Sequence, residues 1–357
     1  MPLTVLSVGY PLAPVSQTTA GGAEHILATL DEALVKAGHR SLVIAPEGSR
    51  CRGTLLPVAT PKDNFDDAAR EFASAQFRSA ITSALAKHPV DVIHMHGLDF
   101  LQYLPDAGVP VIATLHLPPN WYPSEVFKLS RPHTHLVCVS ESQARECPRR
   151  PSGMRVIPNG VCLDNLHPGW TKGNYIFALG RICPEKGFHL ALDAASQCGI
   201  PMLLAGQVFD YETHRQYFET MIRPRLNEQN RFLGAIGGRR KQQLLAGARC
   251  LVVSSLVPET SCLVAMEAIA CGTPVVALRR GALPEIVEHG RTGFLVDSPS
   301  QLTGAILASG NLSSSLCRES AEKKFSADRM IRDYLSLYQE IGNLRRELAV
   351  SSYQEVA

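Results

Sequence analysis

Residues 251–284, LVVSSLVPETSCLVAMEAIACGTPVVALRRGALP, restrict the possible folds of this chain more than any other stretch. Two apolar, β-branched runs, residues 251–255 and 274–278, flank a polar break and a helix-forming segment, residues 263–270, which Gly272 ends. Strands that are buried on both faces are typical of parallel sheets, because crossover helices cover each face. The stretch therefore predicts a parallel β-α-β unit and an α/β fold.

Two carboxylates lie within this unit, Glu259 in the polar loop and Glu267 on the helix. Eight residues of helix rise about 12 Å, roughly the distance from the sugar of a nucleotide-sugar to its ribose. The helix start between them offers backbone N–H groups that suit a diphosphate. One nucleotide-sugar could therefore contact both carboxylates. Two solvated carboxylates on an ordinary crossover helix are the alternative, and the spacing alone favours that alternative.

Composition excludes several classes of protein. The 357 residues suffice for two domains, and 35 basic residues nearly balance 33 acidic ones, so no nucleic-acid partner is expected. No stretch reaches the ~18 apolar residues of a membrane span, and residues 1–8 predict a first strand rather than a signal peptide. The ten cysteines are scattered without a C-x-x-C pair, which is typical of reduced thiols and predicts a cytoplasmic protein.

The first half of the chain alternates strands and helices, which predicts a doubly wound parallel sheet. It opens with a strand over residues 3–8 and a long loop that ends in Gly21 and Gly22 before a helix. Such a loop can bind phosphate, although a purely structural turn fits equally well and the loop is not the G-x-G-x-x-G of dinucleotide sites. His96 and His116 follow two later strands, at the sheet edge where ligands bind.

Two histidine pairs have the i, i+2 spacing that places both side chains on one face of a strand. They are His94 with His96 and His133 with His135. A metal site needs three or four converging ligands, and the sequence provides no such set. We therefore predict no metal site. A lone histidine such as His116 is more often structural than functional.

The second half restarts the alternation after a linker near residues 166–172. We expect an N-terminal domain of residues 1–168 and a C-terminal domain of residues 169–327. The helix predicted near residues 328–357 is expected to join the N-terminal domain, because its apolar face suits docking. This face comprises Ile331, Tyr334, Leu335, Tyr338 and Ile341. Charges of both signs on this helix make peripheral contact with a membrane the lesser alternative.

Several motifs occur in order along the chain. They are Gly21-Gly22-Ala23-Glu24, Thr114-Leu115-His116, Pro158-Asn159-Gly160-Val161, Gly180-Arg181 with Glu185-Lys186-Gly187, the segment from Glu259 to Glu267, Ala270-Cys271-Gly272-Thr273-Pro274-Val275-Val276, Pro284-Glu285 and the turn of residues 290–293. This series resembles the retaining glycosyltransferases of family four, the glycosyl transferases group 1. The resemblance implies a GT-B fold, an α/β architecture of two Rossmann-like doubly wound domains facing across a cleft.

The resemblance also implies an activity. Enzymes of this family move a sugar from a nucleotide-sugar to an acceptor hydroxyl with retention of the anomeric configuration. A UDP-sugar is the expected donor, with guanine and adenine as alternative bases. No further cofactor and no metal are implied, which agrees with the lack of an Asp-x-Asp motif. The acceptor is not indicated.

The motif positions imply which residues form the site. Those implied in catalysis are His116, Arg181, Lys186 and Glu259. Those implied in donor binding are Gly21, Gly22, Arg181, Lys186, Glu259, Ser261, Cys262, Leu263 and Glu267. The basic pair would neutralise the leaving diphosphate, a contribution that acts in the transition state. Glu259 and His116 match contacts of the donor sugar, and Glu267 matches the carboxylate that binds the ribose. The two glycines match a loop whose backbone approaches donor phosphate and acceptor.

Two departures from the family pattern keep alternatives open. Ser261-Cys262 stands where the family often has Phe-Gly, and Cys162 replaces an Asp after Asn-Gly-Val. A cysteine side chain at position 262 would narrow the approach of phosphate, so a non-catalytic nucleotide-sugar-binding subunit is one alternative. A GT-B sugar-nucleotide epimerase or a phosphorylase is another, although no lysine for pyridoxal phosphate is identified. Trp121 and Tyr122 could stack on an acceptor or pack beneath their own loop.

Overall fold

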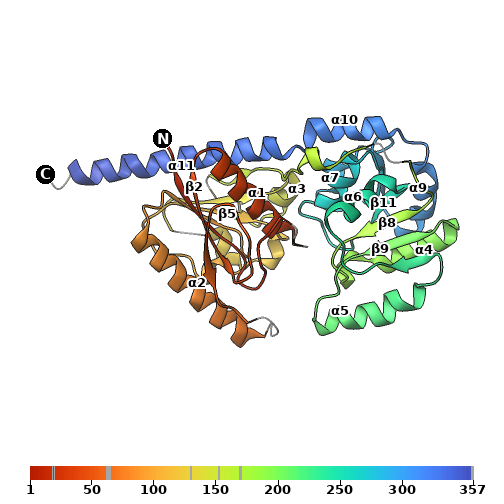
Figure 1. The fold of residues 1–357 in the computed structure, drawn as a ribbon, viewed down its shortest axis with the longest axis horizontal. Coiled ribbons are helices and arrows are strands. Elements are labelled where there is room, and N and C mark those ends of the chain that lie inside the picture. Colours follow the sequence, from red (N-terminus) through yellow and green to blue (C-terminus); the bar gives the residue numbers. More distant parts are fainter. Residues whose placement is uncertain are drawn as a thin grey trace. The chain divides into compact units, whose positions relative to one another are not determined.

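The structure is a computed structural model that describes residues 1–17, 19, 21–61, 66–128, 131–151, 153–168 and 171–354, with the side chains of residue 344 and residues 346–354 excepted. The chain divides into two compact units (Figure 1). Unit 1 comprises Met1–Pro158 and Met330–Ala357, and unit 2 comprises Asn159–Arg329.

The division after residue 158 lies before the expected boundary at residue 168. Hydrogen bonds explain the difference, because residues just after the division are tied to the end of unit 2. The backbone N–H of Val161 donates to the carbonyl of Phe325 at 2.7 Å, and that of Ala327 donates to the carbonyl of Val161 at 3.0 Å. Leu166 is buried in the core of unit 2.

Unit 1 is built on a seven-stranded parallel sheet with the strand order β3-β2-β1-β4-β5-β6-β7. Its elements in chain order are β1 (Thr4–Val8), α1 (Gly22–Lys36), β2 (Arg40–Pro46), β3 (Thr54–Val58), α2 (Asp67–Lys87), β4 (Val92–Met95), β5 (Val111–Leu115), β6 (Thr134–Cys138), α3 (Glu141–Glu146), β7 (Arg155–Val156) and, after unit 2, α11 (Ala327–Gln354). The predicted doubly wound parallel sheet is confirmed. The sequence analysis missed β3, an edge strand in which Pro57 interrupts the apolar pattern.

Apolar residues of β2 alternate between two cores, one on each face of the sheet. Leu42 and Ile44 cluster with Phe77 of α2, whereas Val43 clusters with Leu27 of α1. The strand is therefore buried on both faces, which explains its continuous apolar run. The helices α1 and α2 cover opposite faces of this sheet.

The long helix α11 packs along unit 1 (Figure 1). Tyr334, Tyr338 and Ile341 are fully buried. The Tyr338 hydroxyl lies 2.7 Å from His94 Nδ1, and the Tyr334 hydroxyl lies 3.0 Å from Thr114 Oγ1. The docking face thus combines apolar burial with hydrogen bonds to β4 and β5.

Unit 2 is built on a six-stranded parallel sheet with the strand order β10-β9-β8-β11-β12-β13. Its elements are β8 (Ile176–Leu179), α4 (Phe188–Cys198), β9 (Met202–Ala205), α5 (Glu212–Tyr217), β10 (Asn230–Phe232), α6 (Gly238–Gly247), β11 (Cys250–Val253), α7 (Leu263–Ala270), β12 (Val275–Leu278), α8 (Leu283–Ile286), β13 (Gly293–Val296), α9 (Leu302–Ser309) and α10 (Ser314–Lys324). Leu251 clusters with Met266 of α7, and its neighbour Val252 clusters with Leu192 of α4. Helices therefore cover both faces here as well, and the predicted β-α-β unit is β11-α7-β12.

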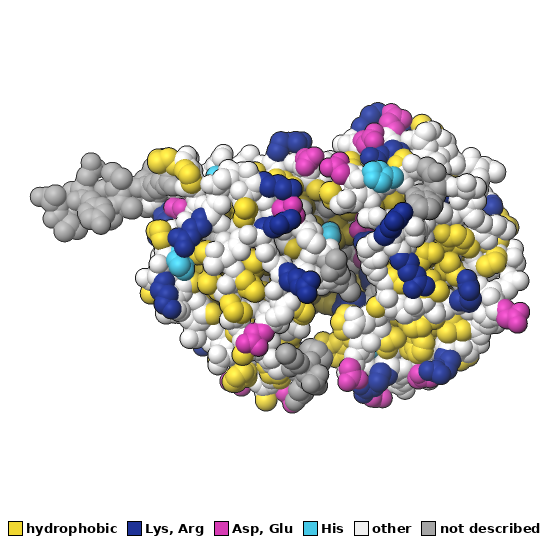
Figure 2. Space-filling view, in the orientation of Figure 1, with side chains coloured by type: hydrophobic (Ala, Val, Ile, Leu, Met, Phe, Trp, Pro, Cys, Tyr) yellow, Lys and Arg dark blue, Asp and Glu magenta, His cyan; other side chains and the backbone are white. Residues whose placement is uncertain are grey.

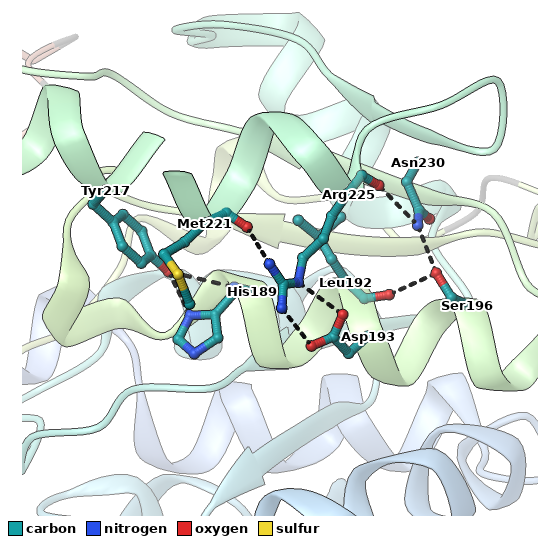
Figure 3. Close-up of polar contacts among 8 residues, drawn as sticks. All are labelled: His189, Leu192, Asp193, Ser196, Tyr217, Met221, Arg225 and Asn230. Carbon is teal, nitrogen blue, oxygen red and sulfur yellow. Dashed lines mark hydrogen bonds and ion pairs between the residues drawn. The ribbon is translucent and has the colours of Figure 1, made fainter. Parts of the chain in front are cut away.

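A polar network, which we call the α4–α5 anchor, holds α5 and the segment after it against α4 (Figure 3). Its members are His189, Asp193, Ser196, Tyr217, Arg225 and Asn230. The sequence of residues 211–227 predicts a mostly helical segment with a break near Pro224. It consists of α5, a π-helical turn Phe218–Ile222 and a short 3₁₀ turn Arg223–Arg225, in which proline supplies no N–H.

Charges are mixed over the surface. On the face drawn in Figure 2, lysine and arginine side chains are scattered and interspersed with acidic ones. Among the residues that the structure describes, no helix is both long and apolar enough to cross a membrane.

Candidate functional site

The strand order of unit 2 reverses between β8 and β11. From β8 the chain proceeds outward through β9 and β10, and from β11 it proceeds the other way through β12 and β13. Loops that leave the carboxyl ends of strands on either side of such a reversal separate and form the usual ligand crevice of doubly wound sheets. The loop after β8 carries Arg181 and Lys186, and the loop after β11 carries Glu259.

Lys186 and Glu259 form an ion pair across these two loops. Lys186 Nζ lies 2.6 Å from Glu259 Oε1, and the two side chains are 26% and 11% exposed. Burial by itself lowers the pKa of Lys186, but the Glu259 carboxylate outweighs it, so the pKa of Lys186 lies above its ordinary value. The Ser255 hydroxyl also donates to Glu259 Oε1. The structure thus places a fixed cation and a fixed carboxylate side by side at the strand-order reversal.

Hydrogen bonds to two backbone carbonyls hold the two loops together. The Ser254 hydroxyl donates to the Lys186 carbonyl at 3.0 Å, and the Leu256 N–H donates to the Glu185 carbonyl at 2.7 Å. Gly187 has a φ of +60°, and a Cβ there would collide with the Ser254 carbonyl. Only glycine therefore fits at this position of the Glu185-Lys186-Gly187 motif.

The start of α7 lies just after Glu259. Ser261 and Cys262 are buried, and no side chain in the described ranges caps the helix. Within the described part of the chain, the Ser261 hydroxyl has no hydrogen-bond partner. Cys262 belongs to the apolar core, and burial raises the pKa of its thiol to about 12, so the thiol stays protonated. The backbone N–H groups at the start of an eight-residue helix, with Leu263 as its first residue, remain suited to an anion.

Glu267 is paired with a residue that the sequence analysis did not select. Its Oε1 lies 2.7 Å from Nζ of Lys241, which α6 supplies, and Glu267 is 9% exposed overall. The helical rise of about 12 Å between Glu259 and Glu267 was wrong, because α7 begins only at Leu263. The helical part from Leu263 to Glu267 rises only about 6 Å. The i, i+26 spacing of Lys241 carries no sequence signal, so only the fold reveals this pair.

Arg181 lies two residues after the end of β8 and is half-buried. Within the described ranges it forms no ion pair, in contrast to Lys186. Its positive charge still acts on its surroundings, since it contributes to lowering the pKa of His214. The site of unit 2 thus contains one paired and one unpaired cation in a single loop.

The remaining predicted residues belong to unit 1. Gly21 is the N-cap of α1 and Gly22 its first residue. The buried carboxylate of Glu24 folds back over Gly21, and a Cβ at Gly21 would collide with it. A side chain at position 21 would therefore require the Glu24 carboxylate to move.

His116 follows β5 and belongs to a histidine cluster with His94 and His96. His116 Nε2 lies 3.0 Å from His96 Nδ1, with the two rings stacked, and His94 stands between Thr114 and Tyr338. Burial lowers the pKa of His116 to about 4 and lowers the pKa of His94 and His96 as well. All three are thus neutral near pH 7. His96 was noted at a strand end but not assigned to the site, and it is the direct neighbour of His116.

Tyr122 packs beneath its loop. It is 6% exposed, and its hydroxyl accepts the backbone N–H of His116 at 2.9 Å and that of Leu117 at 3.2 Å. Trp121 is 40% exposed. Of the two aromatic residues considered for acceptor stacking, Tyr122 therefore has a structural role, which is to hold the backbone of His116.

Comparison with known families decides the class of the protein. The model of Glycosyltransferase Family 4 matches residues 20–165, and that of Glycosyl transferases group 1 matches residues 167–308. This chain belongs to the group 1 glycosyltransferases. The family prediction made from the motif series is confirmed, and so is the prediction that the protein is a glycosyltransferase.

Curated relatives of this glycosyltransferase include two mycobacterial enzymes. The phosphatidyl-myo-inositol mannosyltransferase of Mycobacterium leprae is 26% identical over 316 residues, which cover 80% of this chain and 82% of the relative. That of Mycobacterium tuberculosis is 27% identical over 333 residues, covering 84% and 85%. Both matches extend over most of each chain.

Solved structures confirm the GT-B fold. The sucrose-phosphate synthase of Thermosynechococcus elongatus has a TM-score of 0.80 at 21% identity and covers 95% of this glycosyltransferase and 99% of its own chain. HepE of Anabaena, in complex with UDP-glucose, has a TM-score of 0.72 at 20% identity and covers 94% and 99%. AviGT4, an enzyme of avilamycin A biosynthesis, has a TM-score of 0.71 at 24% identity and covers 96% and 98%.

Proposed function

We propose that this group 1 glycosyltransferase takes a sugar from a nucleotide-sugar, UDP-linked in the first instance, and passes it to an acceptor hydroxyl with retention of configuration. The observation that carries the proposal is the group around Lys186, Glu259 and the start of α7, located where the strand order reverses. The UDP-glucose bound by the structural neighbour HepE supports the choice of base.

In this proposal, Lys186 and Arg181 stabilise the charge that develops on the departing diphosphate. Lys186 is held in place by Glu259 before the reaction, so it needs little reorganisation as the charge forms. The start of α7, with Ser261, Cys262 and Leu263, offers its N–H groups to the same phosphates. Glu259, already oriented by Lys186 and Ser255, accepts hydrogen bonds from sugar hydroxyls.

Glu267 is proposed to bind the ribose hydroxyls, with Lys241 orienting its carboxylate. From unit 1, His116 and the backbone of Gly21 and Gly22 are proposed to contact the donor. A neutral His116 can accept or donate one hydrogen bond to a sugar hydroxyl without bringing a charge. The proposal needs no further cofactor and no metal for transfer, and it places the enzyme in the cytoplasm, where thiols stay reduced.

The test is a screen of UDP-, GDP- and ADP-sugars by thermal shift and by release of free sugar, without added metal and then with it. Stabilisation by UDP-sugars together with slow sugar release supports the proposal. A trial acceptor set should contain phosphatidyl-myo-inositol, because the mycobacterial relatives are named for it. The anomeric configuration of the product, determined by NMR, tests retention.

Two results would contradict the proposal. If no nucleotide-sugar stabilises the protein, the assignment of Glu259 and Glu267 to donor binding is wrong. If a nucleotide-sugar binds but no sugar is released or transferred to any acceptor in the set, the result favours the non-catalytic binding subunit.

A further inference from the structure

Three side chains of metal-binding type converge in unit 2, and none has a role in the proposed transfer. They are Cys183, Glu185 and His214, and their ligand atoms all lie within 4.8 Å of one another. Cys183 and Glu185 flank Pro184 in the loop after β8, and His214 projects from α5. Because His214 is far away in sequence, no spacing motif connects the three residues.

His214 has an unsatisfied nitrogen at this point. The residue is 9% exposed, and its Nδ1 is buried without a hydrogen-bond partner in the described part of the chain. The rings of Tyr211 and Phe209 stand edge-on to the imidazole, with centroids 5.0 Å and 6.5 Å away. A buried polar atom without a partner is costly, and a bound cation would satisfy it.

Cys183 offers a buried thiol to the same space. It is 2% exposed, its Sγ donates a long hydrogen bond, 3.5 Å, to the Arg181 carbonyl of its own loop, and its thiol also hydrogen-bonds the Glu185 side chain. Burial raises the pKa of this thiol to about 11, so it carries its proton in the metal-free protein. A thiophilic cation would displace that proton to water as the metal–sulfur bond forms.

Both elements that carry the ligands are held in position by other contacts. The α4–α5 anchor fixes α5, where the Tyr217 hydroxyl lies 3.0 Å from His189 Nδ1 only three residues beyond His214 (Figure 3). The loop that carries Cys183 and Glu185 is held to the loop after β11, because the Leu256 N–H donates a hydrogen bond to the Glu185 carbonyl. Contacts outside the cluster therefore hold both elements that carry the three ligands.

We propose that Cys183, Glu185 and His214 bind a zinc-class cation, with water as the fourth ligand. One thiolate, one imidazole and one carboxylate are ligands that Zn²⁺ uses, whereas Ca²⁺ and Mg²⁺ prefer oxygen alone. Zinc–ligand distances of about 2.0–2.3 Å require the ligand atoms to approach one another by no more than roughly 1 Å. Two anionic ligands match the charge of Zn²⁺, so the bound cation adds no net charge beside Arg181.

The site joins the loop after β8 to α5. A cation bound there would restrict the motion of the loop that also carries Arg181 and Lys186. The inference stands apart from the proposed function, because its readout is metal binding and not sugar transfer. Failure of one therefore leaves the other open to its own test.

The experiment uses the full chain, stripped of metal and titrated with Zn²⁺ in competition with a chromophoric chelator. We expect one tight equivalent in the wild type, with a rise in Tm on Zn²⁺ addition because the folded state binds the metal. Co²⁺ in place of Zn²⁺ should give a thiolate-to-cobalt absorption band. Cys183→Ser and His214→Gln should each weaken Zn²⁺ binding at least about 100-fold, since each removes a direct ligand.

Two other free cysteines provide matched controls. Cys198→Ser changes a half-buried thiol of the same unit, and Cys162→Ser changes an exposed one. Both should keep the tight equivalent. Circular dichroism checks the fold of every variant. If a variant fails to fold, Glu185→Gln, which changes a half-buried side chain, is tested in its place. The inference is overturned if the wild type binds no tight equivalent, or if that equivalent survives in folded His214→Gln and Glu185→Gln.

Discussion

Among single residues, Lys186 has the most specific predicted effect. Lys186→Ala should lower kcat/KM by about 10²–10³-fold, because it removes a preorganised charge at the departing diphosphate. The measurement is the rate of sugar release or transfer from the donor found in the screen. Lys323→Ala, which changes an exposed lysine, is the matched control and should keep the wild-type rate. A wild-type rate in Lys186→Ala would remove Lys186 from the mechanism.

The same substitution leaves Glu259 without its ion-pair partner. Because the Glu259 side chain is only 11% exposed, some loss of stability is expected in addition to the kinetic effect. Unfolding measured in parallel separates the two effects. Lys186→Arg keeps the positive charge and should retain more activity than Lys186→Ala at similar stability.

Glu267 is predicted to act mainly in donor binding. Glu267→Gln should raise the donor Kd about 10- to 100-fold, since a hydrogen bond to a charged group contributes about 1.5–3 kcal/mol. Titration calorimetry with the nucleoside diphosphate measures this dissociation constant. Lys241→Met keeps the carboxylate but removes its partner, so its effect should be smaller. Unchanged donor affinity in Glu267→Gln would show that this carboxylate serves only its pair with Lys241.

At the scale of elements, the docking of α11 onto unit 1 depends on buried hydroxyls as well as on apolar contact. Tyr338→Phe should lower the free energy of unfolding by about 1–2 kcal/mol, because it leaves His94 Nδ1 without the hydroxyl that now lies 2.7 Å away. Denaturant unfolding of the full chain measures this change. Arg332→Ala, on the exposed side of the same helix, should change stability by no more than about 0.5 kcal/mol. Equal stability of Tyr338→Phe and the wild type would contradict the role of this contact.

Elements differ in how well their sequences specify them. The helix α4 is well specified by its sequence, because a clear apolar face lies between Gly187 and Gly199, both in the left-handed region. The strand β3 was missed, because an edge strand with exposed residues and Pro57 lacks the apolar pattern of its neighbours. The π-helical turn after α5 was missed because it depends on the α4–α5 anchor, which joins residues distant in sequence.

For the whole molecule, stability should fall as the pH drops below about 6.5. His116 has a pKa of about 4 in the folded protein and an ordinary value near 6.5 when unfolded, so between these values only the unfolded state binds the proton. His94 and His96, with pKa values also lowered by burial, act in the same direction. Carboxylates such as Glu288, with its pKa lowered to about 2, contribute a loss only at lower pH, as the pH falls below about 4.5.

Denaturant unfolding at about pH 7 and about pH 5 tests this prediction. The His116 shift alone corresponds to a loss of about 1–2 kcal/mol at pH 5. His116→Asn cannot take up this proton and should show a weaker pH dependence. Stability that is independent of pH over this interval would mean that the histidine cluster is accessible to protons in the folded state.

By itself, the sequence determined most of the elements, the parallel sheets and the family. These follow from local signals: apolar runs for strands buried on both faces, helical periodicity, glycine stops and the order of short motifs. It also selected Lys186, Glu259 and Glu267 through their places in those motifs.

Only the tertiary structure decided which side chains meet. It paired Lys186 with Glu259 and Glu267 with Lys241, and it stacked His116 on His96. It also gathered Cys183 and Glu185 with the distant His214. The physical reason is that strand order decides which loops and helices lie side by side. The clearest case is Lys186 and Glu259, which follow β8 and β11, two strands that are neighbours in the sheet but not consecutive in the chain.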